Sequence, residues 1–103
     1  MLNMIKVKVN YLNGNFSSLS VTGHANSAAY GHDLVCSAVS AVVTGGFNNL
    51  SDIKSYKVTL EEGNASLEAL KEVNAHDKVV IETIISGLKT IAESEPDFVK
   101  IIE

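Results

Sequence analysis

The chain of 103 residues contains one cysteine, one proline, no tryptophan and no arginine. A single cysteine excludes an intramolecular disulfide, and the lack of arginine removes the forked contacts that proteins commonly make with phosphates. The net charge of −4 also disfavours a nucleic-acid partner. No apolar run approaches the roughly 20 residues of a membrane-spanning helix, and residues 1–10 alternate apolar and polar side chains where a secretory signal would be continuously apolar. We therefore expect a cytoplasmic protein without a membrane or nucleic-acid partner.

The composition that remains is that of an ordinary folded protein, with 46% hydrophobic and 19% charged residues. A chain of this size removes about two-thirds of its unfolded surface from water, which supports one core without a metal or disulfide. No linker, repeat or shift in composition divides it. We expect residues 1–103 to form a single domain.

Apolar and polar residues alternate in several segments, a pattern typical of strands with one buried face. Strands are expected at about residues 5–11, 16–24, 56–60, 65–69 and 98–102. Asn13-Gly14 predicts a hairpin turn between the first two, because both positions tolerate positive φ. Glu61-Glu62-Gly63-Asn64 predicts a second, solvated turn.

A first helix is predicted from about Asp33 to Leu50 by apolar residues at helical spacing. Asp33 is the expected N-cap. The helix has many small residues, among them Gly45-Gly46. Each glycine costs a helix about 1 kcal/mol relative to alanine, so the pair indicates close packing against a sheet or another helix.

A second helix is expected to begin near Asn74, with Asp77 three residues later in a cap-like arrangement, and to end before Pro96. The order ββαββαβ predicts an α+β fold of two layers, with two helices on one face of a mostly antiparallel or mixed sheet. An open face or edge of that sheet would favour a homodimer.

The only thiol, Cys36, is expected in the first turn of the first helix. Amide groups there lack helical partners and the helix dipole is positive, so both favour the thiolate. His24, at the end of the second strand, is the candidate base, and the loop between them is long enough to bring the pair together. The Asp33 carboxylate would oppose the thiolate if it occupied the same amides.

Structural roles are the alternative for these residues. On composition alone, a lone cysteine is more often a small core residue and a lone histidine more often structural. A metal site of His24, His32 and Cys36 matches no common zinc spacing. Residues 23–31 also lack the lysine of a phosphate-binding loop and the glycine pattern of a dinucleotide site. We expect neither a metal nor a cofactor.

Taken together, four motifs carry a family resemblance. They are Gly23-His24-Ala25, Tyr30-Gly31, Asp33 and Val35-Cys36-Ser37-Ala38-Val39-Ser40. They resemble the signature of the ribosomal-processing cysteine protease family Prp, and the resemblance covers essentially the whole chain. It implies a cytosolic, homodimeric endopeptidase of ribosome biogenesis. The substrate it implies is a large-subunit ribosomal protein, number twenty-seven of the series, from which a short N-terminal extension is removed.

The resemblance also implies roles for individual residues. Cys36 would be the nucleophile and His24 the general base and acid, while Asp33 would be an orienting or structural residue. In the mechanism we expect, the backbone amides of Cys36 and Ser37 stabilise the oxyanion. A mobile loop over the site would include Ala25 and Gly31.

Two other functions remain open at this point. One is a non-catalytic, ribosome-associated binding module in which Cys36 is structural. The other is a contact with ribosomal RNA through a lysine-rich face, which a salt-dependent gel shift would detect. Its candidate lysines are Lys6, Lys8, Lys54 and Lys57.

Overall fold

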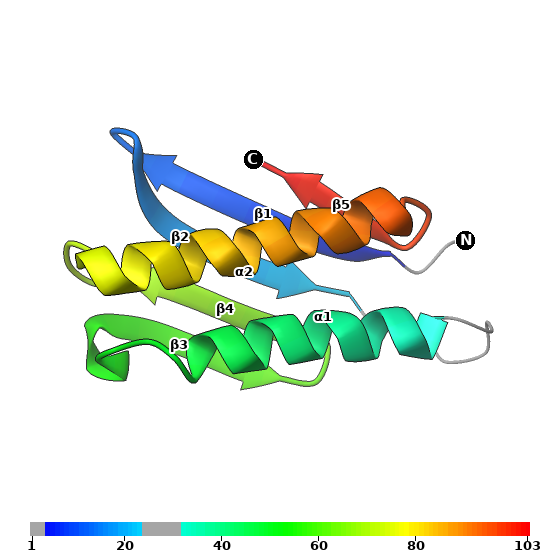
Figure 1. The fold of residues 1–103 in the computed structure, drawn as a ribbon, viewed down its shortest axis with the longest axis horizontal. Helices are drawn as coiled ribbons and strands as arrows, with labels where there is room; N and C mark the ends of the chain where they lie inside the picture. Colours follow the sequence, from blue (N-terminus) through cyan, green and yellow to red (C-terminus); the bar gives the residue numbers. More distant parts are fainter. Residues whose placement is uncertain (1–3, 24–31) are drawn as a thin grey trace.

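The computed structural model describes residues 4–23 and 32–103. Its elements are β1 (Ile5–Leu12), β2 (Asn15–Thr22), α1 (His32–Phe47), the short 3₁₀ helix η1 (Ile53–Ser55), β3 (Tyr56–Glu61), β4 (Asn64–Ala69), α2 (Ala75–Ser94) and β5 (Val99–Ile102). This order confirms the predicted ββαββαβ arrangement, to which η1 is an addition. The two helices lie side by side over one face of the sheet (Figure 1), so the two-layer α+β fold is also confirmed.

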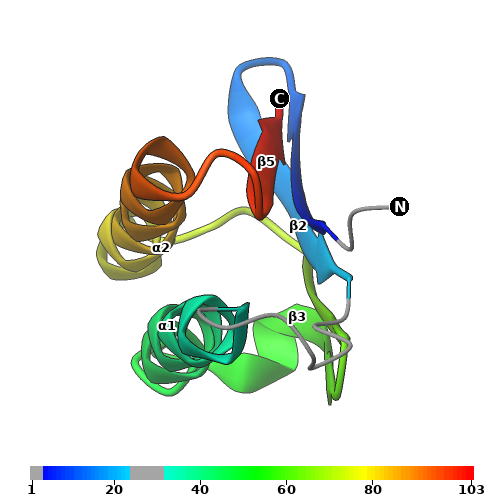
Figure 2. The same cartoon turned by 90° about the vertical axis from the view of Figure 1, so that its right-hand side faces the viewer.

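The five strands form one mixed sheet in the order β3-β4-β2-β1-β5. The β1–β2, β2–β4 and β3–β4 pairs are antiparallel, whereas β5 runs parallel to β1. Figure 2 shows the sheet on one side and both helices on the other. Because β4 pairs with β2, the turn between β3 and β4 comes to lie beside the end of β2, and this placement builds the site described below.

The β1–β2 hairpin turns at Asn13-Gly14 as predicted. Asn13 has φ of 54° and Gly14 has φ of 80°, the left-handed conformations that a tight hairpin requires. The register shifts between Asn10 and Tyr11, which marks a bulge just before the turn.

The core lies between the sheet and the helices, and the strand alternation predicts its members. Ile5, Val7 and Val9 are buried while Lys6 and Lys8 are exposed on the opposite face. Four side chains that are fully enclosed join the two layers: Val7, Leu19, Leu67 and Leu88. Burying each stabilises the fold by about 1.5–3 kcal/mol.

Helix α1 differs from its prediction at both ends. It begins at His32, so Asp33 is its second residue and not the expected N-cap. It ends at Phe47, three residues early, because the Leu50 amide donates to the Phe47 carbonyl at 3.2 Å and closes a tighter turn. Leu50 still packs against the core, which explains its apolar spacing.

The Gly45-Gly46 pair has two different surroundings. A Cβ on Gly46 would lie 2.2 Å from Cγ1 of Ile84 in α2, whereas a Cβ on Gly45 would meet nothing within 4 Å. Of this pair, only Gly46 is therefore required for the close approach of the two helices.

Helix α2 begins as predicted, because the Asn74 side chain accepts a hydrogen bond from the Asp77 amide at 2.8 Å.

The Asp77 carboxylate is almost completely buried, with 1% of the residue exposed. It accepts hydrogen bonds from the Ser51 amide at 2.9 Å and from the Tyr56 hydroxyl at 2.7 Å. Burial alone would raise the pKa of Asp77, but the hydrogen bonds from Ser51 and Tyr56 outweigh it and lower the pKa.

Candidate active site

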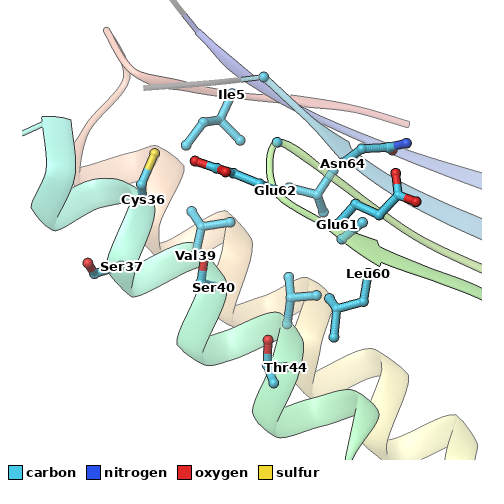
Figure 3. A pocket seen from close by; sticks show the side chains of 15 residues that line it. Ile5, Cys36, Ser37, Val39, Ser40, Thr44, Leu60, Glu61, Glu62 and Asn64 are labelled. Atoms are coloured by element: carbon cyan, nitrogen blue, oxygen red, sulfur yellow. The ribbon is translucent and has the colours of Figure 1, made fainter. Parts of the chain in front are cut away.

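A pocket of about 460 Å³ lies between α1 and the turn that joins β3 to β4 (Figure 3). Residues of α1 form one wall, and the residues that end β3 and begin β4 form the other. The start of β1 and the end of β2 complete it. Its apolar lining consists mainly of Ile5, Val21, Val39, Val43, Leu60 and Ala65. The pocket can therefore hold an apolar side chain or a stretch of extended peptide.

Cys36 lies on the α1 wall of this pocket, near the beginning of the helix. The residue is half-buried, and it packs against the edge of the core while also lining the pocket. A purely structural cysteine would be enclosed by aliphatic groups. The thiol is instead open to any molecule that occupies the pocket.

Gly23 links the end of β2 to both neighbouring walls. Its φ is 124°, and a Cβ at this position would lie 2.3 Å from the carbonyl oxygen of Met4 and 2.9 Å from the Cα of Ile5. Its amide donates to the Gly63 carbonyl at 3.2 Å. Only glycine satisfies both the conformation and the contact. The chain therefore leaves β2 from a fixed point on the pocket, and the next residue in the sequence is His24.

The structure places some of the predicted site residues and not others. His24, Ala25 and Gly31 lie outside the described residues. Ser37 is exposed on α1 and lines the pocket beside Cys36. Asp33 occupies the first turn of α1.

The backbone amides of Cys36 and Ser37 lie beyond the first turn of α1, which begins at His32. In a helix each amide donates to the carbonyl four residues earlier, so both have helical acceptors. The prediction that they hold the oxyanion remains a prediction, and this geometry does not favour it.

The β3–β4 turn is the part of the site that the sequence did not reveal. Glu61 and Glu62 are exposed, as a solvated turn should be, yet both line the pocket opposite α1. No local pattern predicts this, because the turn reaches the pocket only through the pairing of β4 with β2. The pairing also brings Leu60 and Asn64 to the same wall.

The charge of the described lining is negative, since it includes two glutamates and no lysine. Among residues 4–23 and 32–103, no three His, Cys, Asp or Glu side chains gather as a potential metal site. Neither helix in this part of the chain has the length and apolarity needed to cross a membrane. The site therefore offers a thiol, an apolar lining and an acidic rim.

Comparisons with known proteins agree on one family. Residues 4–100 match the family described as cysteine protease Prp. The ribosomal processing cysteine protease Prp of Bacillus subtilis is 32% identical over 94 residues, covering 82% of each chain. That of Mycoplasma pneumoniae is 30% identical over 99 residues, covering 93% of this chain and 91% of the relative. A crystal structure of the S. aureus ribosomal processing protease Prp with a covalently linked product peptide superimposes with a TM-score of 0.80. It is 25% identical and covers 96% of this chain and 98% of that one.

Proposed function

The chain belongs to the cysteine protease Prp family, and we propose from this premise that Cys36 is the nucleophile and His24 the general base of a Cys–His pair. Its activity is that of a cysteine protease, a peptide hydrolase. We propose that residues 1–103 form one such protease domain, with Asp33 as an orienting or structural residue near the start of α1.

One observation carries the assignment of the nucleophile. A cysteine protease needs a thiol that its substrate can reach, and the chain has a single cysteine. That cysteine lines a pocket large enough for peptide side chains.

The assignment of the base rests on position in the chain. Gly23 lines the same pocket as Cys36, and His24 follows it directly. By contrast, His76 belongs to α2 and its Nε2 lies 2.9 Å from the carbonyl of Asn49, beyond the opposite end of α1. His24 is also the histidine of the family motif.

The proposed reaction proceeds by acyl transfer. His24 accepts the Sγ proton of Cys36, and the thiolate attacks the scissile carbonyl carbon to form a tetrahedral intermediate. The imidazolium donates its proton to the leaving amine as the C–N bond breaks, which leaves a thioester on Cys36. His24 then takes a proton from water, and the hydroxide attacks the thioester. The second fragment leaves as a carboxylic acid and the thiol is restored.

The substrate we propose is the N-terminal extension of a large-subunit ribosomal protein, number twenty-seven of the series. The family resemblance and the names of the relatives support this choice, and an S. aureus relative is known with a covalently linked product peptide. We propose a cytoplasmic homodimer with a role in ribosome biogenesis, since these properties accompany the same resemblance. Sedimentation of the purified protein as a monomer would contradict the dimer alone.

The test is cleavage of a peptide that spans the extended N-terminus of that ribosomal protein, followed by mass spectrometry. We expect two fragments from the wild type and none from Cys36→Ala, with binding of the uncut peptide retained. His24→Ala should lose cleavage while its unfolding transition stays in place. Cleavage by Cys36→Ala at the wild-type rate would overturn the nucleophile. Binding by the wild type without cleavage would favour a non-catalytic binding module.

A further inference from the structure

One face of the sheet packs against α1 and α2, and the opposite face has no helix over it (Figure 2). Lys6 and Lys8 of β1 and Lys100 of β5 alternate with residues that pack in the core, and all three are exposed on this open face. The parallel pairing of β1 with β5 places Lys6 directly beside Lys100. Lys8 follows two residues later on β1, about 7 Å from Lys6. We call these three side chains the lysine face.

The lysine face lowers the stability of the fold. Like charges directly opposite each other on neighbouring strands are destabilising, and Lys6 beside Lys100 is such a pair. None of the three lysines forms an ion pair with a described residue, and Glu103, which follows β5, pairs instead with Lys89 of α2 at 2.9 Å. A lysine on an edge strand protects that edge from further pairing, which accounts for Lys100 of β5 but not for the lysines of β1, an inner strand. An anion bound across both strands would offset the repulsion.

Hydroxyl groups border the lysine face. On β2, Thr22 and Ser20 are the partners of the two β1 lysines, and Ser66 of β4 is in turn the partner of Ser20. Ammonium and hydroxyl groups both donate hydrogen bonds to phosphate oxygens. The residues of β1, β2 and β5 that share this face include no acidic and no aromatic residue. Single strands of nucleic acid are commonly held by bases stacked on aromatic rings, so this surface fits the backbone of a double helix better.

The structure divides the four lysines that the sequence put forward for an RNA contact. The two lysines of β1 belong to the lysine face. Lys57 of β3 has Glu68 directly opposite it on β4, and Lys54 belongs to η1. The residue that completes the lysine face, Lys100, reaches it only through the pairing of β5 with β1. The net charge of −4 therefore conceals a local positive surface.

We propose that the lysine face binds the phosphate backbone of double-helical RNA. Its charge is complementary to phosphate, and a contact with the backbone does not require the face to read bases. The choice of RNA rests on the proposed function, because a protein substrate that belongs to the ribosome lies beside RNA. The lysine face and the pocket share β1, since Ile5 lines the pocket and Lys6 follows it with its side chain on the opposite face. RNA held there would keep the protease close to its substrate.

The experiment measures binding of a fluorescently labelled RNA duplex of about 16 base pairs and mixed sequence by anisotropy. The wild type is compared with a glutamine variant, in which all three lysines of the lysine face are replaced by glutamine. The matched control, Lys54→Gln/Lys71→Gln/Lys78→Gln, removes the same total charge from exposed lysines elsewhere. In an arginine variant, arginine replaces the three lysines of the lysine face and keeps their charge.

At about 50 mM salt we expect the wild type to bind with a Kd between about 10⁻⁶ and 10⁻⁴ M. Binding should be about 15- to 60-fold weaker at about 200 mM salt, because two or three phosphate contacts release counterions. The glutamine variant should bind at least about tenfold more weakly at the lower salt and depend less on salt, whereas the control should stay within about threefold of the wild type. The arginine variant should keep the binding. The glutamine variant should unfold at the same urea concentration as the wild type or a higher one, since it lacks the like-charged pair.

Three outcomes would overturn the inference. If the control loses as much affinity as the glutamine variant, only the net charge matters. If polyglutamate at an equal concentration of charge displaces the duplex as well as unlabelled RNA does, the face takes acidic peptides. If the glutamine variant sediments differently from the wild type without RNA, the face is a contact between copies of this chain.

Failure of the proposed function gives a different result. The glutamine variant should cleave a short peptide at the wild-type rate, because the lysine face is on the opposite side of the sheet from the pocket. A wild type that binds the duplex but cleaves no peptide would contradict the proposed function and support the RNA surface. Cleavage of the peptide without binding of the duplex at low salt would overturn the RNA surface alone.

Discussion

Two polar regions at opposite ends of α1 differ in their burial and in their hydrogen bonding. Beyond the end of α1, the Asp77 carboxylate is buried and receives hydrogen bonds from the Ser51 amide and the Tyr56 hydroxyl. Near its beginning, Cys36 and the carboxylate of Glu62 face a pocket that is open to a ligand. The comparison separates polar groups that hold the fold together from a thiol that a ligand in the pocket can reach.

The buried network explains how an irregular connection is held. The chain between α1 and β3 has only η1 as regular structure, and Asp77 ties its Ser51 to Tyr56 of β3 and to the start of α2. Ser51 also accepts a hydrogen bond from the Asn74 side chain at 2.9 Å. Asp77 and Tyr56 are the buried members of this network, so removing one leaves the other buried without its hydrogen bond, whereas Ser51 and Asn74 are exposed to water.

The largest effect is expected from one substitution in each region, compared for stability and for cleavage. Asp77→Ala should lower the free energy of unfolding by about 3 kcal/mol, because Tyr56 and Ser51 lose their acceptor. Cys36→Ala should abolish cleavage and change the free energy of unfolding by less than about 1 kcal/mol, since Cys36 is only half-buried. Urea denaturation and peptide cleavage on the same samples check both. Equal loss of stability in the two variants would remove the distinction.

A smaller effect is expected where α1 packs against α2. Gly46→Ala should destabilise the protein by about 1–3 kcal/mol, because the new methyl group would overlap Ile84. Gly45→Ala is its control, and it should stabilise the helix by up to about 1 kcal/mol, because open space surrounds that position. Thermal unfolding of the two single variants, compared with the wild type, measures both changes in stability. Melting temperatures that shift in the same direction would show that the Ile84 side chain moves aside freely.

The smallest effect is a pH dependence that belongs to the buried network. The pKa of Asp77 is lowered in the fold, so its ionised form contributes stability that is present above the unfolded pKa of about 3.9 and is lost as the pH falls through the folded value. Tyr56→Phe removes one hydrogen bond to Asp77 and should weaken this acid dependence. Urea midpoints measured from neutral pH downward test it, and parallel curves for the two proteins would contradict it.

The same hydrogen bond acts on Tyr56 with the opposite sign. Burial first, and then the bond to Asp77, raise the pKa of the Tyr56 hydroxyl. The neutral hydroxyl therefore contributes stability that is complete below the unfolded pKa of about 10 and is lost as the pH rises above it. The network is consequently stable across the neutral range.

Local signals predicted the regular parts of this fold. Asn13-Gly14 identified the hairpin and Asn74 the start of α2, because each depends only on residues a few positions away. The alternation around Val7 and Val9 identified the buried face of β1 in the same way. By contrast, the true end of α1 was missed, because the apolar spacing that reaches Leu50 reflects core packing and not helix.

The site was only partly predictable for a physical reason. Cys36 could be singled out because it is the only thiol and belongs to a recognisable motif. Glu62 could not, because its place in the pocket depends on the order β3-β4-β2, which long-range pairing decides. The placement of His24 remains a prediction.

The parallel pairing of β1 with β5 has a consequence for the folding of the chain during its synthesis. Ile5, which lines the pocket, pairs with Val99, which the ribosome adds 94 residues later. Contacts so distant along the chain form late and slowly. The edge of the pocket at Ile5 therefore lacks its parallel neighbour until the chain has been synthesised beyond Val99.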